Sequence, residues 1–180
     1  MKKLKIGVMG AGRGRYLASD FLRNGCDVVA FCENSKERAE EYLQYFGDSI
    51  VIYTDFDEFL NHDMDAVVLA NTFHQHAPYA IKCFERGLHV YSECISNVTM
   101  AEGVELIRAF EKSNCIYMLG ENYPYMKFNR EMKKVCDGGT LGKFLFAEGE
   151  YNHPLNPYDT TFMKEFVYHR KHWRNFIPSS

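Results

Sequence analysis

A glycine-rich run near the start of this 180-residue sequence has the residue types and spacing of a phosphate-binding turn. The run, Gly10-Ala11-Gly12-Arg13-Gly14-Arg15, lies between a strand-like segment and a helical one. A pyrophosphate must approach the main chain closely, which glycine permits, and the following helix offers unpaired N–H groups and the positive end of its dipole. The third glycine comes one residue early, and Arg15 takes the sixth position. We predict that this run binds a nucleotide; a plain strand-to-helix turn is the alternative.

An acidic residue further along the chain indicates which nucleotide the glycine-rich run would bind. Glu33 lies 19 residues beyond Gly14, at the end of the second strand-like run, where a dinucleotide-binding fold places a carboxylate that accepts hydrogen bonds from the adenosine ribose. Because a carboxylate there repels a 2′-phosphate, NAD is favoured over NADP. Lys36 and Arg38 are close in sequence and could accommodate such a phosphate. The alternative is that Glu33 only caps the turn that follows it.

Polar residues follow the fourth and fifth strand-like runs, and loops at the carboxyl ends of parallel strands line a ligand crevice. After the fourth run come Asn71, Thr72, His74 and His76, and after the fifth comes Glu93. We predict that these residues contact the cofactor. The alternative for the first loop is a helix N-cap formed by Asn71 or Thr72, with two surface histidines.

These two loops also contain a histidine pair and a cysteine. His74 and His76 have no thiolate or carboxylate partner nearby in the sequence, so we predict no metal site there. Cys94 is either a residue of a nicotinamide pocket or a small buried hydrophobic residue. Neither feature therefore changes the prediction of a nucleotide site.

The segments around these loops alternate between strand-like and helical patterns. The strand-like runs are short, rich in β-branched residues and nearly continuous, as expected of parallel strands covered on both faces. They comprise residues 4–9, 27–32, 49–53, 65–70, 88–91 and 115–119. Helical patterns occupy residues 13–24, 35–47, 77–87 and 99–110, with N-caps predicted at Ser35 and Thr99. The alternation predicts an α/β fold with a doubly wound parallel sheet over residues 1–121.

The composition changes after residue 121, and we predict the start of an incomplete α+β domain over residues 122–180. A helix is predicted for Pro124–Asp137 and a strand for Lys143–Tyr151. Because a lone helix and strand bury little apolar surface, we expect self-association through an open strand edge, or disorder beyond about residue 155. His153 and Tyr123 belong to this part and are the candidates for a catalytic base.

The bulk composition excludes several classes of protein. The chain has 21 basic and 24 acidic residues, a net charge of −3 and a pI of about 6.2, so we predict no nucleic-acid partner, since such binders carry a basic stripe. No apolar run approaches the roughly 18 residues of a membrane span, and we predict no membrane association. The six cysteines form no Cys-x-x-Cys pair and no secretory signal is recognised, which favours free thiols and the cytoplasm.

Several segments, in their order and spacing, resemble the Gfo/Idh/MocA oxidoreductases. The segments that carry the likeness are Ile6 to Arg15, Asp65 to Ala70 with His74 and His76-Ala77-Pro78, Gly87 to Glu93, and Gly139 to Gly142. The resemblance implies an N-terminal NAD(P)-binding Rossmann domain and a C-terminal α/β domain that holds a sugar or polyol. It also implies hydride transfer between a sugar carbon and nicotinamide, and homo-oligomers formed through the second domain.

The sequence departs from this family in one motif. Where the family has Glu-Lys-Pro, this chain has Glu93-Cys94-Ile95, so the lysine that helps to position and polarise the reacting hydroxyl is absent, and cysteine supplies no fixed cation. The family's catalytic histidine helix is expected beyond Ser180. The loss of Lys-Pro, together with Glu148–His153 and His172–Asn175, is similar to a branch in which the bound cofactor serves redox-assisted glycosidic cleavage.

Three functions therefore stay open. The preferred one is an NAD-dependent oxidoreductase that acts on a small sugar-like substrate. The second is a glycosidase-like enzyme that retains NAD, and the third is a nucleotide-binding fragment without catalysis of its own. The sequence predicts a binding site for the cofactor. Hydride transfer from a hydroxyl also needs a catalytic base, and His153 and Tyr123 are the two candidates for it.

Overall fold

The computed structural model describes residues 2–47 and 49–150. The chain divides into two compact units, Met1–Gly120 and Glu121–Ser180, and each is described by itself. The candidate base His153 and the segment beyond about residue 155 lie outside the described residues.

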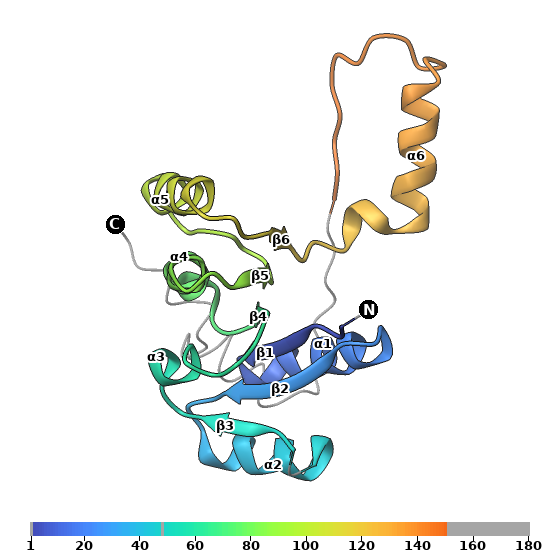
Figure 1. The fold of residues 1–180 in the computed structure, drawn as a ribbon. Helices are drawn as coiled ribbons and strands as arrows, with labels where there is room; N and C mark the ends of the chain where they lie inside the picture. The colour runs from blue at the N-terminus through green and yellow to red at the C-terminus, as the bar shows by residue number, and fades with distance from the viewer. Residues whose placement is uncertain (1, 48, 151–180) are drawn as a thin grey trace, which may run out of the picture. The chain divides into compact units, whose positions relative to one another are not determined.

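The first unit is built on a six-stranded sheet in which every neighbouring pair is parallel (Figure 1). The strands are β1 (Lys5–Met9), β2 (Asp27–Cys32), β3 (Val51–Tyr53), β4 (Ala66–Leu69), β5 (His89–Ser92) and β6 (Tyr117–Leu119). Their order is β3-β2-β1-β4-β5-β6, so the direction of winding reverses between β1 and β4. This confirms the predicted doubly wound fold. Ligands of such sheets bind at the carboxyl ends of the strands where the order reverses.

Helices cover both faces of this sheet. They are α1 (Ala11–Arg23), α2 (Lys36–Phe46), α3 (Phe56–Phe59), α4 (His76–Glu85) and α5 (Met100–Lys112). One buried cluster joins the sheet to α1 and α2 through Leu17 and Tyr42. The other joins it to α3, α4 and α5 through Phe59, Phe84 and Leu106. Successive side chains of a strand point to opposite faces, so each strand contributes to both cores, and Figure 1 shows α3, α4 and α5 on one side of the sheet.

Two helix starts are capped as the sequence predicts. The hydroxyl of Ser35 accepts a hydrogen bond from the backbone N–H of Arg38 at 3.4 Å. At α5, Thr99 and Glu102 form a capping box, in which each side chain accepts from the other residue's N–H. Such caps stabilise a helix by about 1 kcal/mol each, because they satisfy N–H groups that have no partner within the helix.

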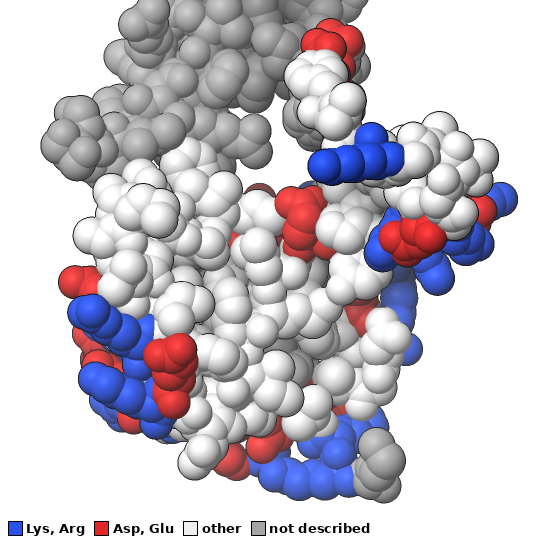
Figure 2. All heavy atoms as spheres, turned by 90° about the horizontal axis from the view of Figure 1, so that it is seen from above, with Lys and Arg blue, Asp and Glu red and all other residues white. Residues whose placement is uncertain are grey.

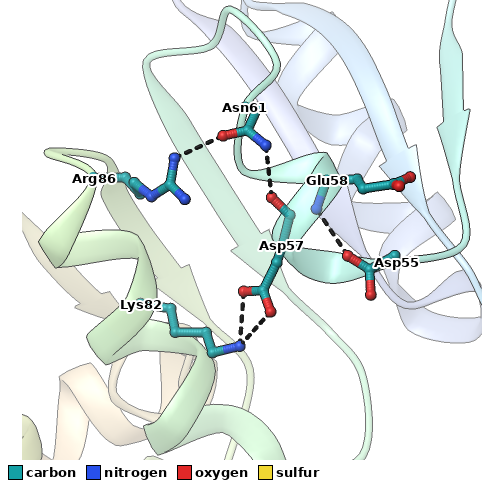
Figure 3. A network of polar contacts seen from close by, with 6 residues as sticks. All are labelled: Asp55, Asp57, Glu58, Asn61, Lys82 and Arg86. Atoms are coloured by element: carbon teal, nitrogen blue, oxygen red, sulfur yellow. Dashed lines mark hydrogen bonds and ion pairs between the residues drawn. The ribbon is translucent and has the colours of Figure 1, made fainter.

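Helix α3 is not predicted from the sequence, because four residues are too few to show a helical period. Asp55 caps it by accepting a backbone N–H bond at 2.8 Å. The carboxylate of Asp57 receives Lys82 of α4 at 2.7 and 2.8 Å, and Arg86 donates to Asn61 at 2.6 Å (Figure 3). These polar contacts are exposed, and an exposed ion pair contributes only about 0–1 kcal/mol to stability. The rings of Phe56 and Phe59 are buried in the core, and their burial therefore stabilises α3 more than the polar contacts do.

The second unit contains a short 3-10 helix, η2 (Tyr123–Tyr125), followed by α6 (Lys127–Asp137). The predicted strand at Lys143–Tyr151 is wrong as far as the structure describes it, because residues 143–150 form no strand. A strand needs a neighbour for its N–H and C=O groups, and no strand pairs with this segment among the described residues. The expected open strand edge therefore does not exist in residues 143–150, although large apolar side chains there, such as Leu145, are exposed.

Within residues 2–47 and 49–150, no helix combines the length and the apolar composition that crossing a bilayer would require. Figure 2 shows Lys and Arg side chains intermixed with Asp and Glu on the face that it draws. Among the described residues of that face, neither sign of charge forms a continuous stripe.

Candidate functional site

The glycine-rich run lies where β1 passes into α1, as predicted, and Gly10 forms the turn between them. Gly10 has φ +93°, and its N–H donates to the carbonyl of Cys32 at 3.0 Å, which ties the turn to the end of β2. A Cβ at this position would lie 2.6 Å from the carbonyl carbon and oxygen of Ala70 and from the nitrogen of Asn71. Both the backbone angle and the crowding therefore require glycine here.

Helix α1 begins at Ala11, so Gly12 and Gly14 lie inside its first turns rather than before it. A Cβ at Gly14 would lie 2.8 Å from Cγ1 of Val8, so this glycine lets the helix pack closely on β1. A Cβ at Gly12 would meet nothing within 4 Å, and the first turn of α1 carries no acidic residue. Gly14 thus allows close packing of α1 on β1, whereas Gly12 leaves open space beside the helix N-terminus, which attracts anions.

Arg13 and Glu93 join the glycine turn to the loop after β5. Nε of Arg13 donates to Oε1 of Glu93 at 2.7 Å, and this hydrogen bond is the main cause that raises the pKa of Arg13. The other carboxylate oxygen of Glu93 accepts the N–H of Cys94 at 3.3 Å. Because β4 lies between β1 and β5 in the sheet, the ion pair spans the carboxyl end of β4, where the winding direction reverses.

The loop after β4 is organised by Gln75, the last residue of the 3-10 helix η1 (Phe73–Gln75). Its Oε1 accepts from Nδ2 of Asn71 at 3.2 Å and from the hydroxyl of Thr72 at 2.8 Å. Thr72 occupies the N-cap position of η1 without a side-chain capping bond. Sequence reasoning misses Gln75, and only its place three residues after Thr72 could have indicated the contact.

Two polar atoms of this loop are buried without a hydrogen-bond partner among the described residues. They are Oδ1 of Asn71 and Nδ1 of His74. Buried polar groups in proteins are nearly always hydrogen-bonded, and the exceptions call for an explanation. A ligand with complementary donors and acceptors at the carboxyl ends of the strands would supply partners for both.

His76 connects the loops that follow β4 and β5. Its Nδ1 lies 2.8 Å from the carbonyl oxygen of Ile95, and its Nε2 lies 3.3 Å from that of Asn71. The side chain is 1% exposed, and burial lowers its pKa, so the imidazole is neutral near pH 7 and donates through one nitrogen. The contact of Nδ1 with the carbonyl of Ile95 is the shorter of the two. His76 is thus a buried residue that contacts both loops, and not a surface histidine. Its contact with the cofactor stays a prediction.

Acidification is expected to destabilise the protein through His76. Its pKa is lower in the folded chain than the ordinary value of about 6.5, so the unfolded chain takes up the proton first as the pH falls. The free energy of unfolding should then decrease below about pH 7 with a slope of up to about 1.4 kcal/mol per pH unit from this residue. Urea unfolding from pH 8 to about pH 5 measures the slope. The variant His76→Asn should lose this contribution, and an unchanged slope would contradict the assignment.

Glu33 directly follows β2, as predicted. Its Oε1 accepts the backbone N–H of Ser35 at 3.1 Å, so the turn-capping contact is present. A carboxylate has about four lone-pair sites and can accept several hydrogen bonds, so this contact is compatible with a ribose role.

The remaining predicted residues make contacts of other kinds. Nη2 of Arg15 donates to the hydroxyl of Tyr16 at 2.8 Å, and the guanidinium carbon is 4.7 Å from the centre of that ring. Tyr123 begins η2 in the second unit, where its carbonyl accepts from Asn129 at 2.7 Å. The catalytic roles of Tyr123 and His153 stay predictions.

A doubly wound parallel sheet with a glycine turn and an open helix N-terminus at its reversal point defines a dinucleotide-binding protein of the Rossmann type. Residues 4–121 match the family model described as "Oxidoreductase family, NAD-binding Rossmann fold". The chain belongs to this family, the Gfo/Idh/MocA oxidoreductases, as its sequence resemblance indicates.

Known proteins of two kinds are similar to this chain. It is 27% identical to glycosyl hydrolase family 109 protein 1 of Shewanella sp. strain ANA-3, over 98% of this chain and 40% of that protein. It is also 27% identical to inositol 2-dehydrogenase of Salmonella typhimurium, over 92% of this chain and 54% of that protein. The chain thus spans about half the length, or less, of these curated relatives.

Solved structures share the fold. Myo-inositol 2-dehydrogenase from Lactobacillus plantarum superposes with a TM-score of 0.73 and 24% identity, over 79% of this chain and 43% of that one. Scyllo-inositol dehydrogenase from Lactobacillus casei, with bound NAD(H) and scyllo-inositol, gives 0.73 and 23% identity, over 78% and 43%. At this level of identity the likeness establishes the fold, not the substrate.

Proposed function

We propose that the crevice binds NAD and that the whole protein is an NAD-dependent oxidoreductase acting on a sugar or polyol hydroxyl. The observation that carries the proposal is the open space at Gly12 beside the N-terminus of α1, at the point where the winding of the sheet reverses. Family membership and similarity to inositol dehydrogenases support the same activity.

The residues present fit a dinucleotide. The first N–H groups of α1, at Ala11, Gly12 and Arg13, would hold the diphosphate, because they have no partner within the helix and lie beside open space. Glu33 would accept the ribose hydroxyls and disfavour a 2′-phosphate, which supports NAD over NADP. The buried atoms of Asn71 and His74 would meet polar groups of the cofactor.

When bound, the nicotinamide ring supplies the acceptor or donor of a hydride. The protein must hold the substrate carbon next to it and take the hydroxyl proton, for which a base within hydrogen-bond reach is needed. Cys94 stands where the family has lysine, so a fixed cation does not come from that position. His153 and Tyr123 are the proposed bases.

Replacing Glu33 with alanine is expected to weaken NAD binding about tenfold or more and to narrow the preference for NAD over NADP. Hydrogen bonds to a charged group contribute about 1.5–3 kcal/mol, and 1.4 kcal/mol corresponds to a factor of ten. Titration of NADH and NADPH fluorescence measures both affinities. Glu37→Ala is the matched control, because Glu37 is an exposed carboxylate that also contacts Ser35, at 2.7 Å. Unchanged affinity for both cofactors would leave Glu33 only its turn-capping contact.

A specific observation favours a second candidate, a glycosidase-like enzyme that retains NAD. The motif Glu93-Cys94-Ile95 replaces Glu-Lys-Pro, and the similarity to a glycosyl hydrolase family 109 protein covers 98% of the chain. Release of a glycosidic leaving group without net formation of NADH would favour this enzyme over a dehydrogenase. Tight NAD binding without either reaction would favour a nucleotide-binding module.

The proposal extends to assembly and location. A homo-oligomer is proposed because α6 carries an apolar stripe of Phe128, Met132 and Val135, each about half exposed, at helical spacing. A cytoplasmic location is proposed because all six cysteines are free thiols.

A further inference from the structure

Glu93 is the less exposed member of the ion pair that spans the carboxyl end of β4. Its backbone N–H donates to the carbonyl of Leu69 at 2.8 Å, and its carboxylate contacts both Arg13 and the N–H of Cys94. The Glu93 side chain is 19% exposed, whereas that of Arg13 is 49% exposed. The carboxylate is therefore held in place by β4 and by its own loop, and the guanidinium reaches to it from the first turn of α1.

The position of this carboxylate is unfavourable for an anionic ligand. Charges interact over a Debye length of about 8 Å at physiological salt, and less screening acts on a group that is largely buried. The diphosphate proposed to lie at the N-terminus of α1 carries negative charge on the same edge of the sheet. Without Arg13, Glu93 would oppose its approach.

Arg13 can serve both anions. A guanidinium has five N–H donors in a planar fork, and the bond to Glu93 uses only Nε. Arg13 is also the third residue of α1, next to the open space at Gly12. A single side chain at this place can cancel the charge of Glu93 and still present N–H groups to a phosphate.

We propose that Arg13 and Glu93 work as one positioning unit that admits the diphosphate of the dinucleotide. Glu93 orients the guanidinium beside the N-terminus of α1, and Arg13 in turn neutralises Glu93. The inference rests on the proposed function, because it concerns the same dinucleotide site. If the inference is correct, replacing Arg13 alone weakens dinucleotide binding more than replacing both residues. The single replacement leaves the partly buried carboxylate of Glu93 unpaired, whereas the double replacement removes that charge.

The test is a double-mutant cycle on the full chain with NADH as the probe, titrated by fluorescence at about 50 mM and about 300 mM salt. Arg13→Leu should raise the Kd about 30-fold, Glu93→Gln about threefold, and the double variant only about fivefold, because neighbouring charges couple by factors of this size. The excess loss in Arg13→Leu should shrink at high salt. Arg13→Lys, which keeps the charge, should recover most of the affinity even if Arg13→Leu folds poorly.

The matched control is the ion pair at the other end of α1. Arg23 and Asp20 are 3.1 Å apart, and Arg23→Leu, Asp20→Asn and their combination should leave the Kd unchanged. If the wild-type chain binds NADH but the effects of Arg13→Leu and Glu93→Gln simply multiply, Arg13 acts independently and the inference is overturned while the proposed function stands. If the wild-type chain does not bind NADH at all, the proposed function itself fails, and the inference fails with it.

Discussion

Alanine at Gly10 is expected to lower the free energy of unfolding by about 4 kcal/mol. This value is the sum of the cost of backbone strain and the cost of steric overlap. The φ of +93° is unfavourable for any residue with a Cβ. The added carbon would also lie 2.6 Å from main-chain atoms of Ala70 and Asn71, which cannot turn away as a side chain could. The turn and the end of β4 would therefore have to separate.

Gly25→Ala separates the two causes. Gly25 has a similar φ of +82°, but a Cβ there would meet nothing within 4 Å. Only the strain applies, so a loss of about 1–2 kcal/mol is expected. Urea denaturation of both variants beside the wild type measures the difference. Equal losses would show that contact with the end of β4 contributes nothing to the requirement for glycine.

The central strands of the sheet could be predicted from sequence because they are largely buried on both faces. Such strands are continuous apolar runs that glycines and polar residues interrupt, and the observed β2 has the predicted bounds, residues 27–32. Helix α1 starts earlier than predicted, at Ala11, because the sharp turn is completed by Gly10 alone. The strand predicted at residues 143–150, which the structure does not form, shows what sequence cannot predict. Its apolar residues suit a strand, but pairing depends on neighbours that local composition does not reveal.

The place of the candidate site in the fold could be predicted from sequence, but its contacts could not. Gly10 lies in the sharp turn that a phosphate site needs, as the sequence predicts, whereas Gly12 and Gly14 lie inside α1. The bond between Arg13 and Glu93 joins residues 80 positions apart, which no local pattern indicates. Similarly, His76 lies in a polar run, and only the packed loops show that it is buried between two carbonyl groups.

Alanine at Gly12 is expected to leave the fold intact and to weaken NAD binding about 100-fold. Gly12 is helical and a Cβ there meets no protein atom within 4 Å, so alanine should stabilise α1 by about 0.5–1 kcal/mol through its better helix propensity. The same Cβ would occupy the space through which the diphosphate approaches the N–H groups. Steric overlap between the alanine Cβ and the diphosphate should cost about 3 kcal/mol in the complex, which corresponds to the expected loss of affinity of about 100-fold.

Gly14→Ala provides the contrast on the same helix. Its Cβ would overlap Cγ1 of Val8 at 2.8 Å, so this variant should lose about 1–3 kcal/mol of unfolding free energy, whereas Gly12→Ala should lose none. Unfolding by urea and titration with NADH, performed on the same preparations, give both quantities for each variant. If Gly12→Ala bound NADH as tightly as the wild type, no diphosphate would lie against the first turn of α1. The open space at Gly12 would then be an ordinary exposed helix surface, and the Arg13–Glu93 pair would have no anion to admit.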